Sequence, residues 1–468
     1  METSEFKELK KKLSATRKNG FDRISDADRA AAEVYCEAYK AFLNRCKTER
    51  LCAAEVIRMA EEQGYRPYVR GTELHAGDKV YHCNRGKSVL LAHIGQAPLS
   101  AGAQLSASHI DAPRLDLKPN PLYEEAELAY LKTHYYGGIR KYQWVTIPLE
   151  LRGVVALKDG SCVEVNLGAD EGDPQLVITD LLPHLGAEQN RKPLGEAIPG
   201  ESLNLLLGSE PIGDEDESGR VKLAVLKLLN EKYGIVEDDF TSAELEVVPA
   251  MKATDIGLDR SMIGAYGHDD RVCAYAALKA LLDLEETPAK TAVCVLADKE
   301  EIGSDGVTGM QSAAFDTFME DLCEAQGVAL RECLEHSFCL STDVTAAYDP
   351  NFAEVYEKRN SALVNYGIGL CKYTGARGKS GASDASAETV AYARRIFDEA
   401  DVIWQIAELG KVDAGGGGTV AMYMANRNIT TLDAGVPVLS MHSPFETVSK
   451  LDCYETYKGI RAVYQAKD

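Results

Sequence analysis

The sequence predicts an α/β protein whose mostly parallel sheet is flanked by helices and whose chain carries an inserted β-rich domain. After about residue 252, short apolar runs alternate with helix-like segments, which is typical of a parallel sheet. Between about 112 and 252 the pattern changes to half-buried strands and acidic, glycine-bearing loops. At 468 residues the chain is also longer than one usual domain. We therefore predict a discontinuous α/β domain of residues 1–111 and 253–468, interrupted by a β-rich domain of residues 112–252.

The N-terminal part is predicted to form helices followed by strands. Ser25 with Asp28 three positions later resembles a capping box, and Val34, Ala38 and Phe42 then fall on one helical face. Two short buried strands are expected at 88–92 and 105–108, where the chain is apolar.

Alternation predicts a half-buried strand inside the insertion. Val145, Ile147, Leu149 and Leu151 are separated by single residues that are polar or, at Pro148, unable to donate a backbone hydrogen bond. We therefore expect Pro148 to mark a sheet edge or a bulge.

The C-terminal part is predicted to alternate between helices and strands. Its expected helices cover 271–286, 385–399 and 450–466, and its expected strands cover 291–297, 338–341 and 430–439.

Charge and composition exclude several classes of function. The chain holds 51 Lys and Arg against 73 Asp and Glu, so its net charge is −22 at pH 7. A surface this negative repels nucleic acid and anionic lipid. No stretch approaches the roughly 20 apolar residues of a membrane span, the charged N-terminus lacks a signal core, and the 12 cysteines form no CxxC pair. We predict a cytoplasmic protein with neither nucleic-acid nor membrane partners.

Acids and histidines follow the predicted strands, where ligand sites of open α/β sheets gather. A further acidic pair, Asp269-Asp270, opens a predicted helix. Imidazole nitrogen and carboxylate oxygen suit zinc, cobalt or manganese, and the lack of clustered cysteines argues against a structural thiolate site. The residues that follow strands in this way are His109, Asp111, Glu300, Glu301, Asp343 and His442.

Two details give the metal hypothesis chemical content. In an extended strand His109 and Asp111 point to the same face, so the Asp111 carboxylate can hold the imidazole from behind. Adjacent Glu300 and Glu301 can divide the work between ligating a metal and accepting a proton, and the residues alone leave open which does which.

Competing motifs are absent or ambiguous. The sequence has no GxSxG, HExxH or GxxxxGK[ST] pattern. The run 415–418 before Thr419 is either a loop that offers backbone N–H groups to a ligand or a flexible turn. His134 in a Tyr/Gly-rich loop is either structural or a substrate contact, and His268 beside the acidic pair is a possible support for the ligands.

Five segments together resemble, in order and spacing, the zinc aminopeptidases of the aspartyl aminopeptidase / aminopeptidase I family, in its bacterial branch. The resemblance covers nearly the whole chain, and the ordered set is far more specific than any single motif. The segments are Ser108-His-Ile-Asp-Ala-Pro113, Gly267-His-Asp-Asp-Arg271, Asp298-Lys-Glu-Glu-Ile-Gly-Ser304, Ser341-Thr-Asp343 and Met441-His-Ser443.

The resemblance implies two divalent ions per subunit, zinc before cobalt or manganese. In this family pattern Asp269 would bridge both ions, Glu300 would be the general base for a metal-bridging hydroxide, and Asp111 would support His109. The implied metal ligands are His109, Asp269, Glu301, Asp343 and His442.

The same resemblance implies the fold, the assembly and the substrate. It implies a zinc-peptidase α/β domain with an inserted β-barrel-like dimerisation domain, and a homodimer that assembles into a homododecamer. Substrates would be peptides with a free N-terminus and an acidic or a neutral, leucine-like first residue. Lys372 matches a family lysine that contacts substrate, although it is equally compatible with an ordinary surface lysine, and His184 matches a segment near a neighbouring active site.

Two alternatives remain beside a metallo-aminopeptidase. A two-metal deacylase of acylamino compounds would use the same scaffold but would need a pocket for a carboxylate instead of a free amine. A catalytically silent assembly protein would have lost a ligand or the base, and none of the residues implied for these roles is missing.

Overall fold

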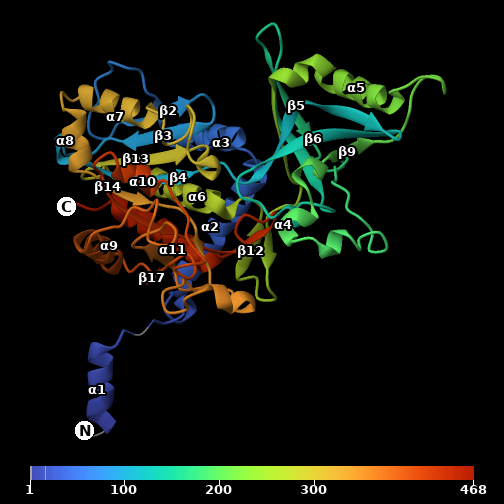
Figure 1. Ribbon diagram of the computed structural model, residues 1–468. Helices are drawn as coiled ribbons and strands as arrows, with labels where there is room; N and C mark the ends of the chain where they lie inside the picture. Colours follow the sequence, from blue (N-terminus) through green and yellow to red (C-terminus); the bar gives the residue numbers. More distant parts are fainter. Residues whose placement is uncertain (1–2, 16, 468) are drawn as a thin grey trace.

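The computed structural model describes residues 3–15 and 17–467, which form two lobes (Figure 1). One lobe contains a nine-stranded sheet covered by helices, and the other contains a six-stranded sheet with a single long helix. Helix α1 (Thr3–Leu13) stands apart from both lobes. No helix of the described ranges is long and apolar enough to cross a membrane.

The nine-stranded sheet is mixed and mostly parallel, which confirms the predicted fold class. Its central neighbours β13–β4, β4–β14 and β14–β18 are parallel, and antiparallel pairs occur on either side of them. In spatial order its strands are β1 (Arg66–Pro67), β2 (Lys79–Asn84), β3 (Ser88–His93), β13 (Thr291–Ala297), β4 (Ala103–His109), β14 (Phe338–Ser341), β18 (Thr430–Gly435), β16 (Ile368–Cys371) and β17 (Trp404–Ile406).

Helices cover both faces of this sheet, so its central strands are buried on both sides. Along β13, Ala292, Cys294 and Leu296 join one hydrophobic core, and the residues between them join the other. The first core is shared with α2 (Asp26–Arg45), α3 (Glu49–Glu62), α6 (His268–Leu282), α9 (Ala387–Glu399) and α11 (Lys450–Tyr464). The second is shared with α7 (Ala314–Glu324), α8 (Leu330–Glu335) and α10 (Ala421–Ala425).

The second lobe is an antiparallel sheet packed against α5 (Arg220–Tyr233). Isolated bridges Leu149–Leu176 and Val177–Leu206 place one segment between β7 and β9, which curls the sheet toward a barrel. Its strand order is β8 (Cys162–Leu167), β7 (Leu149–Ala156), β10 (Ala243–Pro249), β5 (Arg114–Glu125), β6 (Leu128–Tyr136) and β9 (Leu205–Gly208), and the short α4 (Leu194–Ala197) lies in the same lobe. That the lobes are separate domains, divided at 111/112 and 252/253, stays a prediction.

A third sheet of five strands, which the sequence did not predict, is also present. The expected strand 430–439 was wrong as a single element, because its chain forms β18 in one sheet and β19 in another. The break falls at Gly435, where a Cβ would lie 1.9 Å from the carbonyl oxygen of Asp343, so only glycine allows this close approach. The third sheet contains β11 (Thr254–Ile256), β12 (Met262–Ala265), β20 (Glu446–Ser449), β19 (Pro437–Leu439) and β15 (Thr345–Ala346).

The expected apolar face of α2 was also wrong. The Ser25 hydroxyl accepts the Asp28 N–H, as the sequence predicts, but Val34 is 74% exposed and Ala38 is exposed. The buried face is one residue further along and contains Tyr35 and Tyr39 with Phe42. Each residue rotates the direction of the side chain by about 100° around the helix axis. The prediction had the right helical spacing but started one residue too early, and Val34 therefore faces solvent.

The half-buried strand predicted across 145–151 is shorter at its start. Strand β7 begins at Leu149, directly after Pro148, which has no N–H for a ladder hydrogen bond. Its burial does not alternate at first, since Glu150 is only 2% exposed. The acid is buried because Arg152 and Lys47 compensate its charge, which a pattern based on polarity alone does not register.

Candidate metal centre

The candidate ligands meet at the carboxyl ends of the three central parallel strands. His109 is the last residue of β4, Asp343 follows β14 by two residues, and Glu300 and Glu301 form the turn after β13. Asp269 comes from the first turn of α6. Because neighbouring parallel strands end at one edge, side chains that are far apart in the sequence are brought together there.

The carboxylate of Asp269 lies between the two histidines. Its Oδ1 is 3.2 Å from His109 Nε2, and its Oδ2 is 3.1 Å from His442 Nε2. His442 lies in the turn between β19 and β20, and its Nε2 is also 3.6 Å from Glu301 Oε2. On the other side, Asp343 Oδ1 is 3.8 Å from His109 Nε2. The Asp269 carboxylate therefore lies between two clusters of candidate ligands, one at each imidazole.

Both imidazoles present the nitrogen that a metal would need. His109 Nδ1 lies 3.1 Å from the Asp111 carbonyl and 3.2 Å from its Oδ1, and His442 Nδ1 lies 2.9 Å from the Gly138 carbonyl. An Nδ1–H donated to oxygen leaves the Nε2 lone pair free toward Asp269. Both rings are thus oriented with Nε2 toward Asp269, the nitrogen through which each could bind a cation.

Electrostatics in this site favour positive charge. Burial raises the pKa of Glu301, and the Asp269 charge raises it further. Burial also raises the pKa of Asp343, which faces Asp270. Burial alone would lower the pKa of His442, yet Asp269 and Glu301 outweigh it and raise that pKa to about 11. Crowded carboxylates at low exposure need a cation beside them.

The donor set fits zinc. Glu301 Oε1 is buried without a hydrogen-bond partner, which is the expected state of an oxygen reserved for a metal. Imidazole nitrogen with carboxylate oxygen is a usual catalytic zinc donor set. Two groups bring their ligand atoms within 4.8 Å of one another: His109 with Asp269 and Glu301, and His109 with Asp343 and Glu300.

Glu300 and Glu301 differ in environment, although they are adjacent. Both side chains line the cavity above, but that of Glu301 is 4% exposed and faces His442, whereas that of Glu300 is 18% exposed. Burial, together with the Asp111 and Asp269 charges, outweighs His109 and raises the pKa of Glu300 to about 7. Glu300 Oε2 is also 3.8 Å from His109 Nε2, so its oxygen is in reach of the ligand cluster.

Asp111 supports more of the centre than the sequence predicted. Strand β4 ends at His109, so the two residues do not share a strand, yet the carboxylate still reaches His109 Nδ1. Its oxygens also accept the backbone N–H groups of Glu300 and Glu301, both at 3.2 Å. Asp111 therefore orients one histidine and both adjacent glutamates.

Sequence reasoning missed Glu446, the first residue of β20. Its Oε1 accepts the His442 N–H at 2.7 Å, and its Oε2 accepts the Asp269 N–H at 3.0 Å. It is 1% exposed, and burial with the nearby Asp269 charge raises its pKa to about 8. The only signal was an acid four residues after His442, at the start of the short segment Glu446-Thr-Val-Ser449.

His268 and His134 do not join the cluster. The ring of His268 is held between the Tyr39 hydroxyl and the Ile263 carbonyl. The exposed His134 has its Nδ1 against the carbonyl of Tyr135. Both side chains therefore have structural contacts.

A cavity of about 450 Å³ opens above the candidate ligands. The 416–418 glycines and Thr419 line it, so this loop lies at the site. Apolar side chains form much of the remaining wall: Val344, Leu409, Met422 and Met441.

The two predicted substrate contacts lie outside this cavity wall. Lys372 follows β16 next to lining residues, but its Nζ is 3.0 Å from Asp384 Oδ1, and Lys379 pairs with the other oxygen. His184 is exposed on a loop of the β-rich lobe. Neither side chain is brought to the ligands within one chain, so both roles stay predictions.

Comparisons with known proteins point to one family. Residues 42–464 match the family model described as aminopeptidase I zinc metalloprotease (M18). A probable M18 family aminopeptidase 1 from Clostridium acetobutylicum is 49% identical over 95% of this chain and 97% of its own length. A crystal structure of an M18 family aminopeptidase from Thermotoga maritima is 43% identical, covering 97% of this chain and 100% of that one, with a TM-score of 0.92. A structure of the S. cerevisiae mApe1 dodecamer is 21% identical, covers 93% and 98%, and has a TM-score of 0.74, so it shares the fold.

Proposed function

This chain belongs to the M18 family of aminopeptidase I zinc metalloproteases and is an aminopeptidase, and we propose how its residues perform the hydrolysis. The observation that carries the proposal is the Asp269 carboxylate, whose two oxygens face two different imidazoles. We propose that Asp269 would be a ligand shared by two divalent ions, most simply zinc. His109 and Asp343 would complete one site, and Glu301 and His442 would complete the other.

When bound, two such ions would polarise the scissile carbonyl and lower the pKa of water toward about 7. Glu300 then acts as the general base, since both glutamates line the cavity but the Glu300 side chain is the more exposed of the two. It accepts the proton of the attacking water and returns that proton to the departing amine. Asp111 accepts a hydrogen bond from the Glu300 N–H, which limits the positions that the Glu300 carboxylate can take.

The cavity wall supports a neutral, apolar first residue in the substrate. No Lys or Arg lines the cavity in the part of the chain that the structure describes. Lys372 and Lys379, the candidates for binding an acidic side chain, both pair with Asp384. We therefore propose that leucine-like N-terminal residues are preferred over aspartate and glutamate, and that Lys372 contacts substrate only where Asp384 releases it.

We also propose the assembly and its setting. The 1–111/253–468 part would be the catalytic domain, and the 112–252 part would mediate a homodimer that assembles into a cytoplasmic homododecamer. Support comes from the yeast mApe1 dodecamer, whose chain shares this fold. In the assembly the exposed His184 would reach a neighbouring active site. Light scattering tests this: the proposal expects a mass twelve times 50.9 kDa.

The central experiment compares wild type with Glu300→Gln on fluorogenic Asp, Glu, Leu, Met and Lys substrates. Wild type should release dye, lose activity with chelator and regain it with zinc or cobalt, and favour Leu and Met. Glu300→Gln should keep both ions while its kcat falls about 10²–10⁴-fold, the usual contribution of a general base.

Other outcomes would redirect the proposal. Loss of one ion from Glu300→Gln would make Glu300 a ligand, as its distance to His109 allows. Hydrolysis of acylamino acids with no release from any free-amine substrate would favour the deacylase.

A further inference from the structure

The β-rich lobe sends one short segment into the metal centre. Tyr136 ends β6, and Gly137 and Gly138 follow it. The Tyr136 hydroxyl donates to Asp111 Oδ2 at 2.8 Å, and the Gly138 carbonyl lies 2.9 Å from His442 Nδ1. Two contacts thus run from the segment 136–138 to the centre, one to the support of His109 and one to His442 itself.

Gly137, between them, lies against Glu301. Its φ is +75°, and a Cβ there would be 3.3 Å from both Glu301 Cβ and Oε2. A side chain at this position would be strained and would press on that glutamate. Residues 136–138 therefore contact three members of the centre through three neighbouring positions.

Arg114 fixes Tyr136 from behind. The two residues are directly paired across β5 and β6, and the Arg114 guanidinium lies 3.9 Å from the centre of the Tyr136 ring. Both side chains are buried, with 6% and 7% of their surface exposed. A buried guanidinium stacked on an aromatic ring is held strongly in place.

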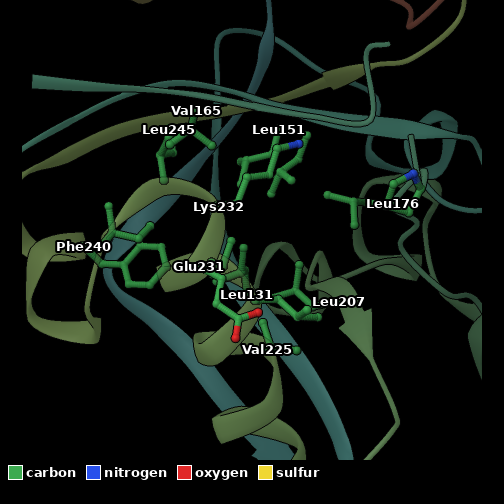
Figure 2. A pocket seen from close by; sticks show the side chains of 15 residues that line it. Leu131, Leu151, Val165, Leu176, Leu207, Val225, Glu231, Lys232, Phe240 and Leu245 are labelled. Atoms are coloured by element: carbon green, nitrogen blue, oxygen red, sulfur yellow. The ribbon is translucent and has the colours of Figure 1, made fainter. Parts of the chain in front are cut away.

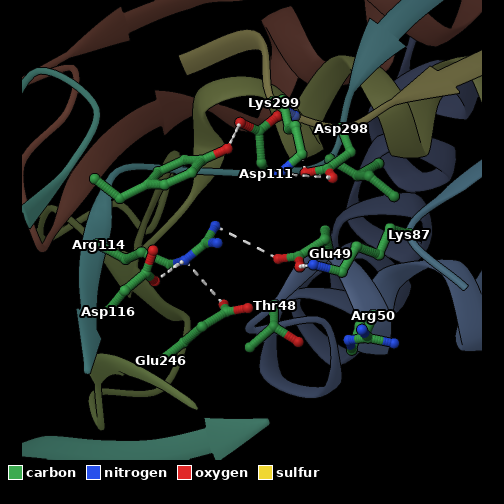
Figure 3. A network of polar contacts seen from close by, with 12 residues as sticks. Thr48, Glu49, Arg50, Lys87, Asp111, Arg114, Asp116, Glu246, Asp298 and Lys299 are labelled. Atoms are coloured by element: carbon green, nitrogen blue, oxygen red, sulfur yellow. Dashed lines mark hydrogen bonds and ion pairs between the residues drawn. The ribbon is translucent and has the colours of Figure 1, made fainter. Parts of the chain in front are cut away.

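The same guanidinium joins the two lobes, as Figure 3 shows. It lies 3.2 Å from Glu246 and 2.8 Å from Asp116 in the β-rich lobe, and 3.4 Å from Glu49 at the start of α3 in the other lobe. Burial alone would raise the pKa of Glu49, but Arg114 and Lys87 outweigh it and lower that pKa to about 2. The position of Arg114 therefore depends on how the two lobes pack against each other.

We propose that Tyr136, Gly137 and Gly138 are positioning residues that set the geometry of the metal centre. Arg114 links them to the contact between the two lobes, so the packing of the β-rich lobe determines where they lie. Tyr136 acts through Asp111, which orients His109 and both adjacent glutamates. The inference rests on the proposed function only for its catalytic readout, since the contacts also predict metal affinity.

The test is Tyr136→Phe in the full-length assembled enzyme, which removes one hydroxyl and keeps the ring under Arg114. Removing a direct partner of a metal ligand costs about 10- to 100-fold in metal affinity or activity, and Tyr136 bonds to such a partner, Asp111. We expect both zinc affinity, measured by competition with a chromophoric chelator, and kcat to fall in that range while KM stays near wild type. The visible spectrum of the cobalt-substituted enzyme should also shift.

Tyr233→Phe is the matched control. Its hydroxyl donates to the Asn166 carbonyl in the β-rich lobe, away from the ligands, so this variant should match wild type in metal affinity and kcat. A Tyr136→Phe variant that loses only thermal stability, like any buried hydroxyl deletion, would overturn the proposal.

A double variant separates action through Asp111 from a general effect. If Tyr136 works through Asp111, Tyr136→Phe adds little to the losses of Asp111→Asn, whereas independent effects would multiply. Weaker zinc binding by Tyr136→Phe, in a protein whose wild type cleaves no peptide, would refute the proposed function alone. Unchanged zinc affinity in an active Tyr136→Phe enzyme would refute the positioning role alone.

Discussion

Two cavities of similar size occupy the two lobes and differ in chemistry. The cavity above the metal centre measures about 450 Å³, and the one between α5 and the β-rich sheet measures about 490 Å³. Figure 2 shows the second, where leucine, valine and phenylalanine side chains converge and Glu231 and Lys232 of α5 also line the wall. The first holds crowded acids and a buried carboxylate oxygen without a partner.

The comparison teaches that volume does not identify a catalytic site. An apolar cavity loses packing contacts but leaves no polar group in need of a partner. The buried carboxylates of the polar cavity are costly without a cation, so its chemistry demands a ligand. The first cavity should therefore govern turnover and metal binding, and the second should govern stability.

The largest effect is expected from Asp269→Asn in the polar cavity. The variant removes the charge shared by both ligand clusters, so both ions should be lost and kcat should fall more than about 10³-fold, the scale on which enzymes depend on metal catalysis. Metal analysis of the purified variant and peptide turnover check this. A variant with wild-type metal content would contradict the assignment of metal binding to the polar cavity.

A smaller effect, on stability and not on turnover, is expected from Leu229→Ala in the apolar cavity. Leu229 is 9% exposed, and deleting a buried leucine usually lowers the free energy of unfolding by about 2–5 kcal/mol. Denaturant unfolding measures this, while zinc affinity and kcat should stay at wild type. Loss of turnover in a folded Leu229→Ala enzyme would contradict the separation of roles. Val225→Ile, which fills the same space, serves as the control and should not destabilise.

The smallest effect concerns Lys47, which joins the lobes by donating to the carbonyls of Pro249 and Met251. Burial, with the Arg271 and Arg152 charges, outweighs Glu150 and lowers the pKa of Lys47 from 10.5 to about 8. Above pH 8 the folded state releases this proton before the unfolded state does. The unfolded state then binds more protons than the folded state. The free energy of unfolding of wild type, minus that of Lys47→Met, should therefore rise with pH by at most about 1.4 kcal/mol per pH unit.

Unfolding of both proteins between pH 8 and 9.5 measures this difference, and titrations that they share cancel. Below pH 8 both states of Lys47 are protonated, so the difference should be flat there. A difference that stays flat between pH 8 and 9.5 would show that Lys47 remains charged in the folded protein and would contradict the prediction.

The sequence alone anticipated much of the α/β lobe because its signals are local. The strands 291–297 and 338–341 were predicted with the bounds observed, since each is a short apolar run between clear breaks. The strand ends then pointed to His109, Glu300 and Asp343, because parallel strands bring their carboxyl ends to one edge. The buried face of a helix and the unbroken length of a strand were harder to predict. Val34 is exposed instead of buried, and the predicted strand 430–439 splits at Gly435.

What the sequence determined by itself was therefore the fold class, the family resemblance and a set of candidate ligands, all carried by residue type and short-range order. Only the tertiary structure decided that Glu446 holds Asp269 and His442, that Tyr136 reaches Asp111, and that Lys372 pairs with Asp384. These contacts join residues far apart in the chain or depend on how a turn folds back. No periodicity records such contacts, because they arise only when separate sheets pack and their buried charges must be compensated.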